Sequence, residues 1–148
     1  MKSVSPYTIF NITNNTFSGN RANINGGGIY SGSSAVELMN TIVANNTSDN
    51  CFGIITSLGF NLEDTNTCGF TKMTDLTNTN PQLGPLQDNG GPTLTHALLP
   101  ISPAIDRADN AACPTDDQRG KPRPIDICDS RSSAAFWVAL FNDTIASS

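Results

Sequence analysis

Two short stretches of similar sequence indicate the fold. Residues 14–20 read NNTFSGN, and residues 40–46 read NTIVANN. The two stretches coincide when the chain is shifted against itself by about 25 residues, which is the length of one coil of a β-solenoid. The residues that coincide are Asn15 with Asn40, Thr16 with Thr41, Phe17 with Ile42, Asn20 with Asn45, Gly28 with Gly53 and Ile29 with Ile54.

The chemistry of these residues fits such a coil. Phe17 and Ile42 would both point inward and lie about 4.8 Å apart, the spacing of neighbouring strands. Asn20 and Asn45 fall where the chain must turn, because asparagine tolerates left-handed backbone angles. Their side-chain amides would pair from coil to coil. The sequence therefore predicts an all-β fold built from the coils of a right-handed parallel β-helix (a solenoid).

A run of glycines follows the first stretch. Gly26, Gly27 and Gly28 precede Ile29 and Tyr30, which predicts a tight corner and then a strand with Ile29 facing inward and Tyr30 outward. The Gly-Gly-Gly-Ile and Asn-x-Thr-Phe/Ile-x-x-Asn motifs resemble repeats of polymorphic outer-membrane and autotransporter-like bacterial β-helices. The resemblance covers about residues 7–62 and implies a passenger carried on a cell surface.

The second half of the chain has a different character, with frequent Pro and Gly. Residues 80–106 read NPQLGPLQDNGGPTLTHALLPISPAID, and residues 117–124 read DQRGKPRP. Together with the nearby cysteines and a Cys-Asp pair ending at residue 129, this pattern resembles the C-terminal module called the choice-of-anchor Q domain. The resemblance implies the C-terminal end of a large exported bacterial protein. Family members continue with an Ile-Gly-Ala-aromatic-Glu ending, from which residues 130–148 depart.

These features divide the chain into three parts. We expect β-helix coils over residues 1–70, an irregular Pro/Gly-rich wrap over residues 71–131 and a divergent tail over residues 132–148. Within the tail, residues 134–141 (AAFWVALF) form an apolar run that is less than half of the ~20 residues a membrane span needs. We therefore expect no transmembrane span, and a final strand or short helix that covers an open end.

The charge balance excludes nucleic acid as a partner. The chain has 13 acidic and 8 basic residues, a net charge of -5, whereas binding to phosphates needs clustered Lys and Arg. The one run with several cations, residues 119–131, also carries Asp126 and Asp129, so its charge is mixed.

The four cysteines predict disulfides. Cys51, Cys68, Cys113 and Cys128 lack the Cys-x-x-Cys spacing of zinc and redox sites. Proximity favours Cys51 with Cys68 and Cys113 with Cys128, and each closed loop would stabilise the fold by roughly 3 kcal/mol. Two other connectivities stay open, as do four buried thiols in a cytosolic protein. Disulfides predict an extracellular or cell-surface location.

The sequence predicts no catalytic, cofactor-binding or metal-binding residues. Cleavage of polysaccharides needs two or three carboxylates close together. The shift of about 25 residues instead places Glu37, Glu63 and Asp64 over apolar residues. We therefore expect that the chain is not itself an enzyme.

The remaining ionisable groups have structural interpretations. His96 is the only histidine, and we expect its ring to hydrogen-bond backbone carbonyls and fix a turn. Asp116, Asp117 and Arg119 are expected to form ion pairs, because the Asp-x-Asp-x-Asp-Gly spacing of a calcium loop is absent.

Two functional hypotheses follow. The first is a non-catalytic, structural or adhesive C-terminal module of an exported bacterial cell-surface protein, without cofactors. Its partners would be carbohydrate or protein ligands, upstream β-helix coils, or a second copy that associates through the N-terminal edge. The alternative is a fragment of a polysaccharide-acting lyase or glycoside hydrolase whose catalytic coils lie upstream.

Overall fold

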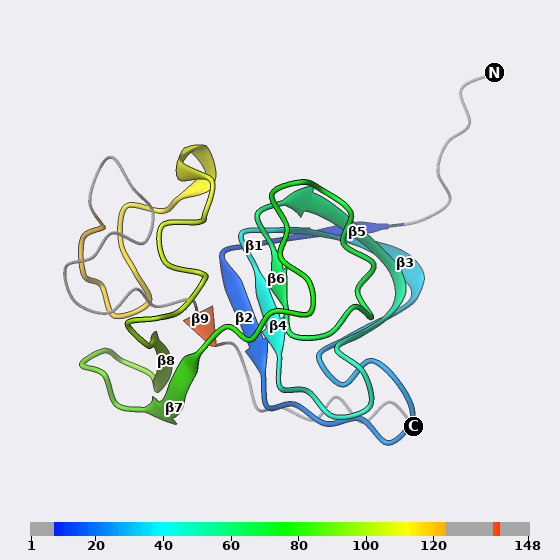
Figure 1. Cartoon of the computed structure of the whole chain (residues 1–148), viewed down its shortest axis with the longest axis horizontal. Helices are drawn as coiled ribbons and strands as arrows, with labels where there is room; N and C mark the ends of the chain where they lie inside the picture. Colours follow the sequence, from blue (N-terminus) through cyan, green and yellow to red (C-terminus); the bar gives the residue numbers. More distant parts are fainter. Residues whose placement is uncertain (1–7, 124–137, 140–148) are drawn as a thin grey trace.

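The structure is a computed structural model that describes residues 8–123 and 138–139 (Figure 1). Within these residues it contains strands and one short 3-10 helix, so the prediction of an all-β fold is confirmed. The elements in chain order are β1 (Ile9–Thr13), β2 (Asn15–Ser18), β3 (Ile29–Met39), β4 (Ile42–Ala44), β5 (Cys51–Gly59), β6 (Leu62–Glu63), β7 (Leu83–Gln87), β8 (Thr95–Leu98), η1 (Asn110–Ala112) and β9 (Val138–Ala139).

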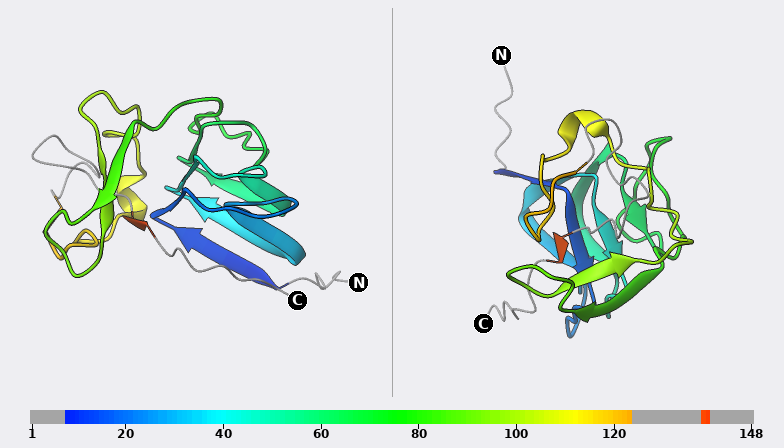
Figure 2. Two further views of the ribbon diagram at one scale, coloured as in Figure 1. Left: turned by 90° about the horizontal axis from the view of Figure 1, so that it is seen from below. Right: turned by 90° about the vertical axis from the view of Figure 1, so that its left-hand side faces the viewer.

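The strands form three small sheets. Two are parallel, with strand orders β1-β3-β5 and β6-β4-β2-β9, and the third is the antiparallel pair β7-β8. From β1 to β6 the chain alternates between the two parallel sheets, so that successive strands of each sheet stack side by side (Figure 2).

The prediction of a parallel β-helix is wrong. The described strands form small, separate sheets and no closed or solenoid sheet. The expected repeat of constant length is also absent, because the step between paired residues is 26 from Asn14 to Asn40 but 20 from Thr41 to Asn61. The register differs from the expected one as well, since Phe17 pairs with Val43 and not with Ile42. A solenoid needs a fixed repeat to stack equivalent residues, and these segments do not provide one.

Strand β4 lies between two apolar clusters, and all three of its residues are buried. On one side Val43 packs with Leu38 and Val36 of β3 in the cluster between the two parallel sheets. On the other side Ile42 packs with Leu98 of β8 in the cluster beneath the second half of the chain. The short strand β4 therefore joins the two halves through side chains that point in opposite directions.

Asparagines pair at the turns, as the sequence predicted, although the pairs are shifted by one residue. Asn40 donates from Nδ2 to Oδ1 of Asn14 at 3.0 Å, and Oδ1 of Asn46 accepts from the backbone N–H of Asn20 at 3.0 Å. Asn14 and Asn40 both have left-handed backbone angles, with φ of 59° and 50°. Asparagine adopts these angles more readily than other residues with a side chain.

The Asn14–Asn40 pair also holds the second half of the chain. Asn14 Nδ2 donates to the carbonyl of Ala112 at 2.7 Å, and Asn40 Oδ1 accepts from the backbone N–H of Asp109 at 2.8 Å. Both contacts fall at η1, whose first residue follows the N-cap Asp109. The wrap is thus attached to the turns of the first half by side-chain amides as well as by apolar packing.

The second half contains more regular structure than expected, because β7 and β8 form a hairpin where the sequence predicted an irregular wrap. Near the C-terminus, β9 pairs in parallel with β2, with Asn15 opposite Val138. Apart from Val138 and Ala139, the apolar segment 134–141 lies outside the described residues, so its expected role is not described. No helix among the described residues is long and apolar enough to cross a membrane.

The glycine corner supplies a test of the packing. A Cβ atom built on Gly27 would lie 2.0 Å from the carbonyl oxygen of Thr47, whereas one on Gly32 would lie 3.4 Å from the nearest side-chain atom. We expect Gly27→Ala to lower the free energy of unfolding by about 1–3 kcal/mol through overpacking. Gly32→Ala should change it by less than about 0.5 kcal/mol. Urea denaturation measures both, and equal effects would contradict the close approach of the two turns.

Candidate functional site

The disulfide Cys51–Cys68 lies in the apolar cluster between the parallel sheets, which confirms this predicted pair. Cys113 is also disulfide-bonded. Its predicted partner, Cys128, lies outside the described residues. The Cys51–Cys68 disulfide thus joins the start of β5 to the segment after β6, beside the apolar cluster.

Glu63 is a completely buried carboxylate beside this disulfide. It occupies the inward-facing row that begins with Phe17 and Val43, at the position where a further apolar residue would be expected. Its Oε1 accepts from the backbone N–H of Thr67 at 2.7 Å, and its Oε2 accepts from the backbone N–H of Cys68 at 3.1 Å. The carboxylate therefore ends the apolar row by binding the backbone of the loop that covers it.

Side-chain hydroxyl groups also donate hydrogen bonds to Glu63. The hydroxyls of Thr65 and Thr67 donate to Oε1 at 2.7 and 2.8 Å. Asn50 Nδ2 lies 2.6 Å from Oδ1 of Asp64, and Asp64 Oδ2 accepts from the backbone N–H of Asn45. A buried carboxylate is stable only when such donors replace its lost hydration. We call the set Asn50, Glu63, Asp64, Thr65 and Thr67 the Glu63 cluster.

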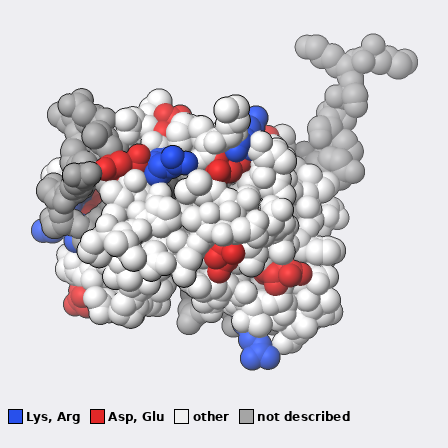
Figure 3. All heavy atoms as spheres, viewed as in Figure 1, with Lys and Arg blue, Asp and Glu red and all other residues white. Residues whose placement is uncertain are grey.

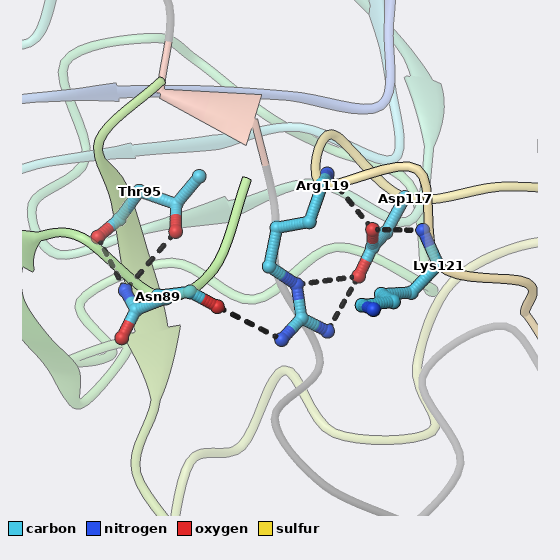
Figure 4. Close-up of polar contacts among 5 residues, drawn as sticks. All are labelled: Asn89, Thr95, Asp117, Arg119 and Lys121. Atoms are coloured by element: carbon cyan, nitrogen blue, oxygen red, sulfur yellow. Dashed lines mark hydrogen bonds and ion pairs between the residues drawn. The ribbon is translucent and has the colours of Figure 1, made fainter. Parts of the chain in front are cut away.

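A second polar cluster lies in the second half of the chain (Figure 4). Arg119 donates to Asp117 Oδ2 from Nε at 2.8 Å and from Nη2 at 2.6 Å, in an ion pair whose two side chains are largely buried. The backbone N–H of Lys121 donates to Asp117 Oδ1 at 2.9 Å. The predicted ion pairing is therefore confirmed for Asp117 and Arg119, while Asp116 takes no part in this pair.

This ion pair connects the two motifs of the second half. Arg119 Nη1 donates to the carbonyl of Asn89, and the Asn89 amide donates to the carbonyl of Thr95 at 2.8 Å. Gly91 lies so close to Arg119 that a Cβ there would be 2.8 Å from the Arg119 Cα. The DNGG and DQRG stretches, about 30 residues apart, thus pack directly against each other.

The environment of Asp117 fixes its charge state. Burial by itself would raise the pKa of this carboxyl group, but the Lys121 N–H and the Arg119 guanidinium and N–H stabilise the charged form. Together they hold the pKa of Asp117 below its usual value of 3.8. The residue is an ionised structural anchor and is not available as a proton donor near neutral pH.

The ring of His96 contacts a backbone carbonyl, as predicted, but the contact joins two strands and does not fix a turn. Its Nδ1 lies 2.7 Å from the carbonyl oxygen of Gly84, across the β7–β8 hairpin. Among residues 8–123 no three His, Cys, Asp or Glu side chains gather in a way that could hold a metal ion. A small hollow lies between β4, β6 and the second half and is lined by Ile42, Leu62, Leu76 and Ala104, among others.

The outer face of the β1-β3-β5 sheet exposes large apolar side chains. Tyr30 faces outward as predicted and stacks on Phe52, with ring centroids 5.7 Å apart. Tyr30 is 64% exposed and Phe52 46%. Farther along the same face, Ile9 and Ile54 flank Ala35 in one row across the sheet. We call Ile9, Tyr30, Phe52 and Ile54 the outer apolar strip. The space-filling view shows that charged groups are sparse and scattered over the side of the molecule it presents (Figure 3).

Glu37 and Glu63 do not stack on one another. Glu37 lies beside Asn11 and Thr56 on the outer face, and Glu63 pairs with Val43. The shift of about 25 residues predicts Glu63 over Leu38, which is wrong because Glu63 lies beside Val43 of β4. Its burial was missed because a Glu among Asp, Thr and Asn residues resembles an exposed turn. The signal that could have indicated it is the run EDTNTC, in which two Thr residues and a Cys follow the Glu closely.

Comparisons with protein-family models, with curated proteins and with solved structures find no match to this chain.

The Glu63 cluster predicts a graded series of stabilities. Glu63→Ala leaves the buried backbone N–H of Cys68 and the partly buried N–H of Thr67 without their acceptor. An unsatisfied buried group costs about 1–3 kcal/mol, so we expect a loss of about 2–4 kcal/mol in the free energy of unfolding. Glu63→Gln keeps one acceptor oxygen and should lose less. Glu37→Ala, a matched change on the outer face, should lose less than about 0.5 kcal/mol. Similar losses for Glu63→Ala and Glu37→Ala would rule out the proposed role of the buried carboxylate.

The lowered pKa of Asp117 predicts a dependence of stability on acid. A folded-state pKa below 3.8 means that the unfolded chain binds more protons in that range, so the contribution of Asp117 is complete above this value and is lost as the pH falls through the folded pKa. Asp117→Asn should flatten the decline of stability below about pH 4. Denaturation of both proteins between neutral pH and strong acid measures this, and parallel curves would show that Asp117 has an ordinary pKa.

Proposed function

We propose that this chain is a non-catalytic module of an exported bacterial protein that gives structure to a surface assembly or adheres to ligands there. The observation that carries the adhesive part is the outer apolar strip, in which a stacked Tyr–Phe pair stays open to solvent. Aromatic side chains of this kind are enriched at binding surfaces because they contribute a large contact area with little loss of conformational entropy.

The state of the acidic groups supports a structural role over a catalytic one. Cleavage of a polysaccharide requires carboxylates that reach the substrate. Glu63 is completely buried and Asp117 is held by an ion pair, so each acts as a hydrogen-bond acceptor for its own chain. These two carboxylates therefore stabilise the fold and do not face a substrate. This favours the first hypothesis over a fragment of a polysaccharide-acting enzyme.

Two further observations support export and the proposed resemblance. The Cys51–Cys68 disulfide is the kind of bond that persists in oxidising compartments. The DNGG and DQRG motifs, on which the resemblance to the choice-of-anchor Q domain rests, contact each other through Arg119 and Gly91. This contact gives the two motifs a common structural role, which supports our proposal that the chain belongs to that family.

We further propose that the edge of β1 is a contact for another strand, either from an upstream segment or from a second copy. β1 is the outer strand of its sheet, and its residues carry no charge that would deter pairing. Phe10 is in register with the buried Val36 yet is 54% exposed. An added strand would cover Phe10 and continue the parallel sheet.

The adhesive proposal is tested by binding of the purified chain to immobilised neutral and acidic polysaccharides and to immobilised bacterial surface protein. We expect retention on at least one of these, and a loss of about tenfold or more for the Tyr30→Ser/Phe52→Ser pair, as each aromatic contact contributes about 1 kcal/mol. The control pair Ile24→Ser/Ile101→Ser changes exposed apolar residues away from the sheet and should bind as the unaltered chain does.

Three results would count against the proposal. Absence of binding to every immobilised probe would remove the adhesive role. Equal losses in the two variant pairs would remove the outer apolar strip as the contact. Release of new reducing ends from the polysaccharides would favour the enzymatic alternative.

A further inference from the structure

We propose that Asn25 is a site of spontaneous deamidation in the folded protein, a covalent modification that is independent of the proposed function. The chain contains two Asn-Gly pairs, Asn25–Gly26 and Asn89–Gly90. A glycine after asparagine leaves the backbone nitrogen uncrowded, because no Cβ hinders its approach to the side chain. The surroundings of the two pairs differ, and this difference determines which one reacts.

The reaction uses only the chain and water. The backbone nitrogen of Gly26 attacks Cγ of Asn25, a new C–N bond closes a five-membered succinimide, and the side-chain amide leaves as ammonia after taking up the proton from the Gly26 nitrogen. Water then adds to either carbonyl of the ring and opens it. The product is aspartate when one C–N bond breaks and isoaspartate when the other does. No oxidant or reductant is needed.

At Asn25 neither reacting group is occupied. Among the described residues the Asn25 side-chain amide has no hydrogen-bond partner, and the Gly26 N–H donates no hydrogen bond, whereas the next two N–H groups, of Gly27 and Gly28, are bonded to the turn at Asp49 and Asn50. Asn25 lies in a bend and is partly exposed, whereas Gly26 is buried. The Asn25 side chain is therefore partly open to water, and no hydrogen bond holds either this amide or the Gly26 N–H in place.

At Asn89 both reacting groups are occupied. The Asn89 Nδ2 donates to the carbonyl oxygen of Thr95 at 2.8 Å and to its hydroxyl at 3.0 Å. The attacking nitrogen of Gly90 donates its proton to Asp88 Oδ1 at 2.8 Å. Closure of the ring at Asn89 must break these bonds, and the adjacent carboxylate disfavours the loss of the Gly90 proton. The second Asn-Gly pair is thus protected by the fold.

The modification would act on a closely packed corner of the first half. Gly27 N donates to the carbonyl of Asp49 at 2.8 Å, and Gly28 N to the carbonyl of Asn50 at 3.1 Å. Isoaspartate at position 25 inserts one methylene into the backbone directly before these contacts. It would displace the corner against a neighbour that leaves no room for a Cβ on Gly27 or Gly28.

The test is peptide mapping by mass spectrometry of the full chain after incubation at mildly alkaline pH, in native buffer and in denaturing urea. In native buffer we expect aspartate and isoaspartate at position 25 to form at least about tenfold faster than at position 89, which corresponds to about 1.4 kcal/mol of activation free energy. In urea the two rates should converge, because both sites then lose their contacts.

Two variants separate the structural cause from sequence effects. Asp88→Ala removes an exposed carboxylate and frees the Gly90 N–H, so conversion at Asn89 should rise in native buffer while conversion at Asn25 stays unchanged. Asn25→Gln should abolish conversion at position 25. A native rate at Asn25 equal to or below that at Asn89 would overturn the proposal, and so would an Asn25 that converts only in urea.

Discussion

In the turns between the short strands, many backbone N–H and C=O groups have no hydrogen-bond partner on a neighbouring strand. The rest of the structure depends on how these groups are satisfied. Buried backbone groups without partners are expensive. Here asparagine, threonine and glutamate side chains supply the missing acceptors and donors. Asn61 accepts from the backbone N–H of Thr41, Asn46 from that of Asn20, and Glu63 from those of Thr67 and Cys68. Many of the polar side chains of this chain are therefore buried, where they bond the backbone of the turns.

The same requirement explains how the second half is attached and why the fold departs from a regular solenoid. Asn14 and Asn40 bind both each other and the backbone around η1, so one pair of amides joins two turns and the wrap. Because side chains can hydrogen-bond the backbone of turns of different lengths, the number of residues between paired strands can change along the chain, from 26 to 20. The three sheets are small, and they are held together by the apolar clusters between them and by the Cys51–Cys68 bond.

Local chemistry was predictable from the sequence, whereas long-range register was not. The β-rich class, the opposite directions of Ile29 and Tyr30, the Cys51–Cys68 pair and the Asp117–Arg119 ion pair all follow from nearby residues. The offset of Phe17 relative to Val43 depends on turn lengths, which similar-looking Asn-rich stretches do not specify. Glu63 was missed because its burial depends on Thr65, Thr67 and Cys68 folding back over it. For function, the open Tyr30–Phe52 pair needed the sheet register before it could be identified as one surface.

Amide hydrogen exchange read residue by residue tests most directly whether side-chain acceptors hold the turns as firmly as strand pairing holds the sheets. The account predicts that the N–H groups of Thr41, Thr67 and Cys68, each bonded to a buried side chain, exchange as slowly as that of Val43 in β4 and only through global unfolding. Exchange of these three amides at the rate of a fully exposed residue such as Met73, while Val43 stays protected, would contradict it.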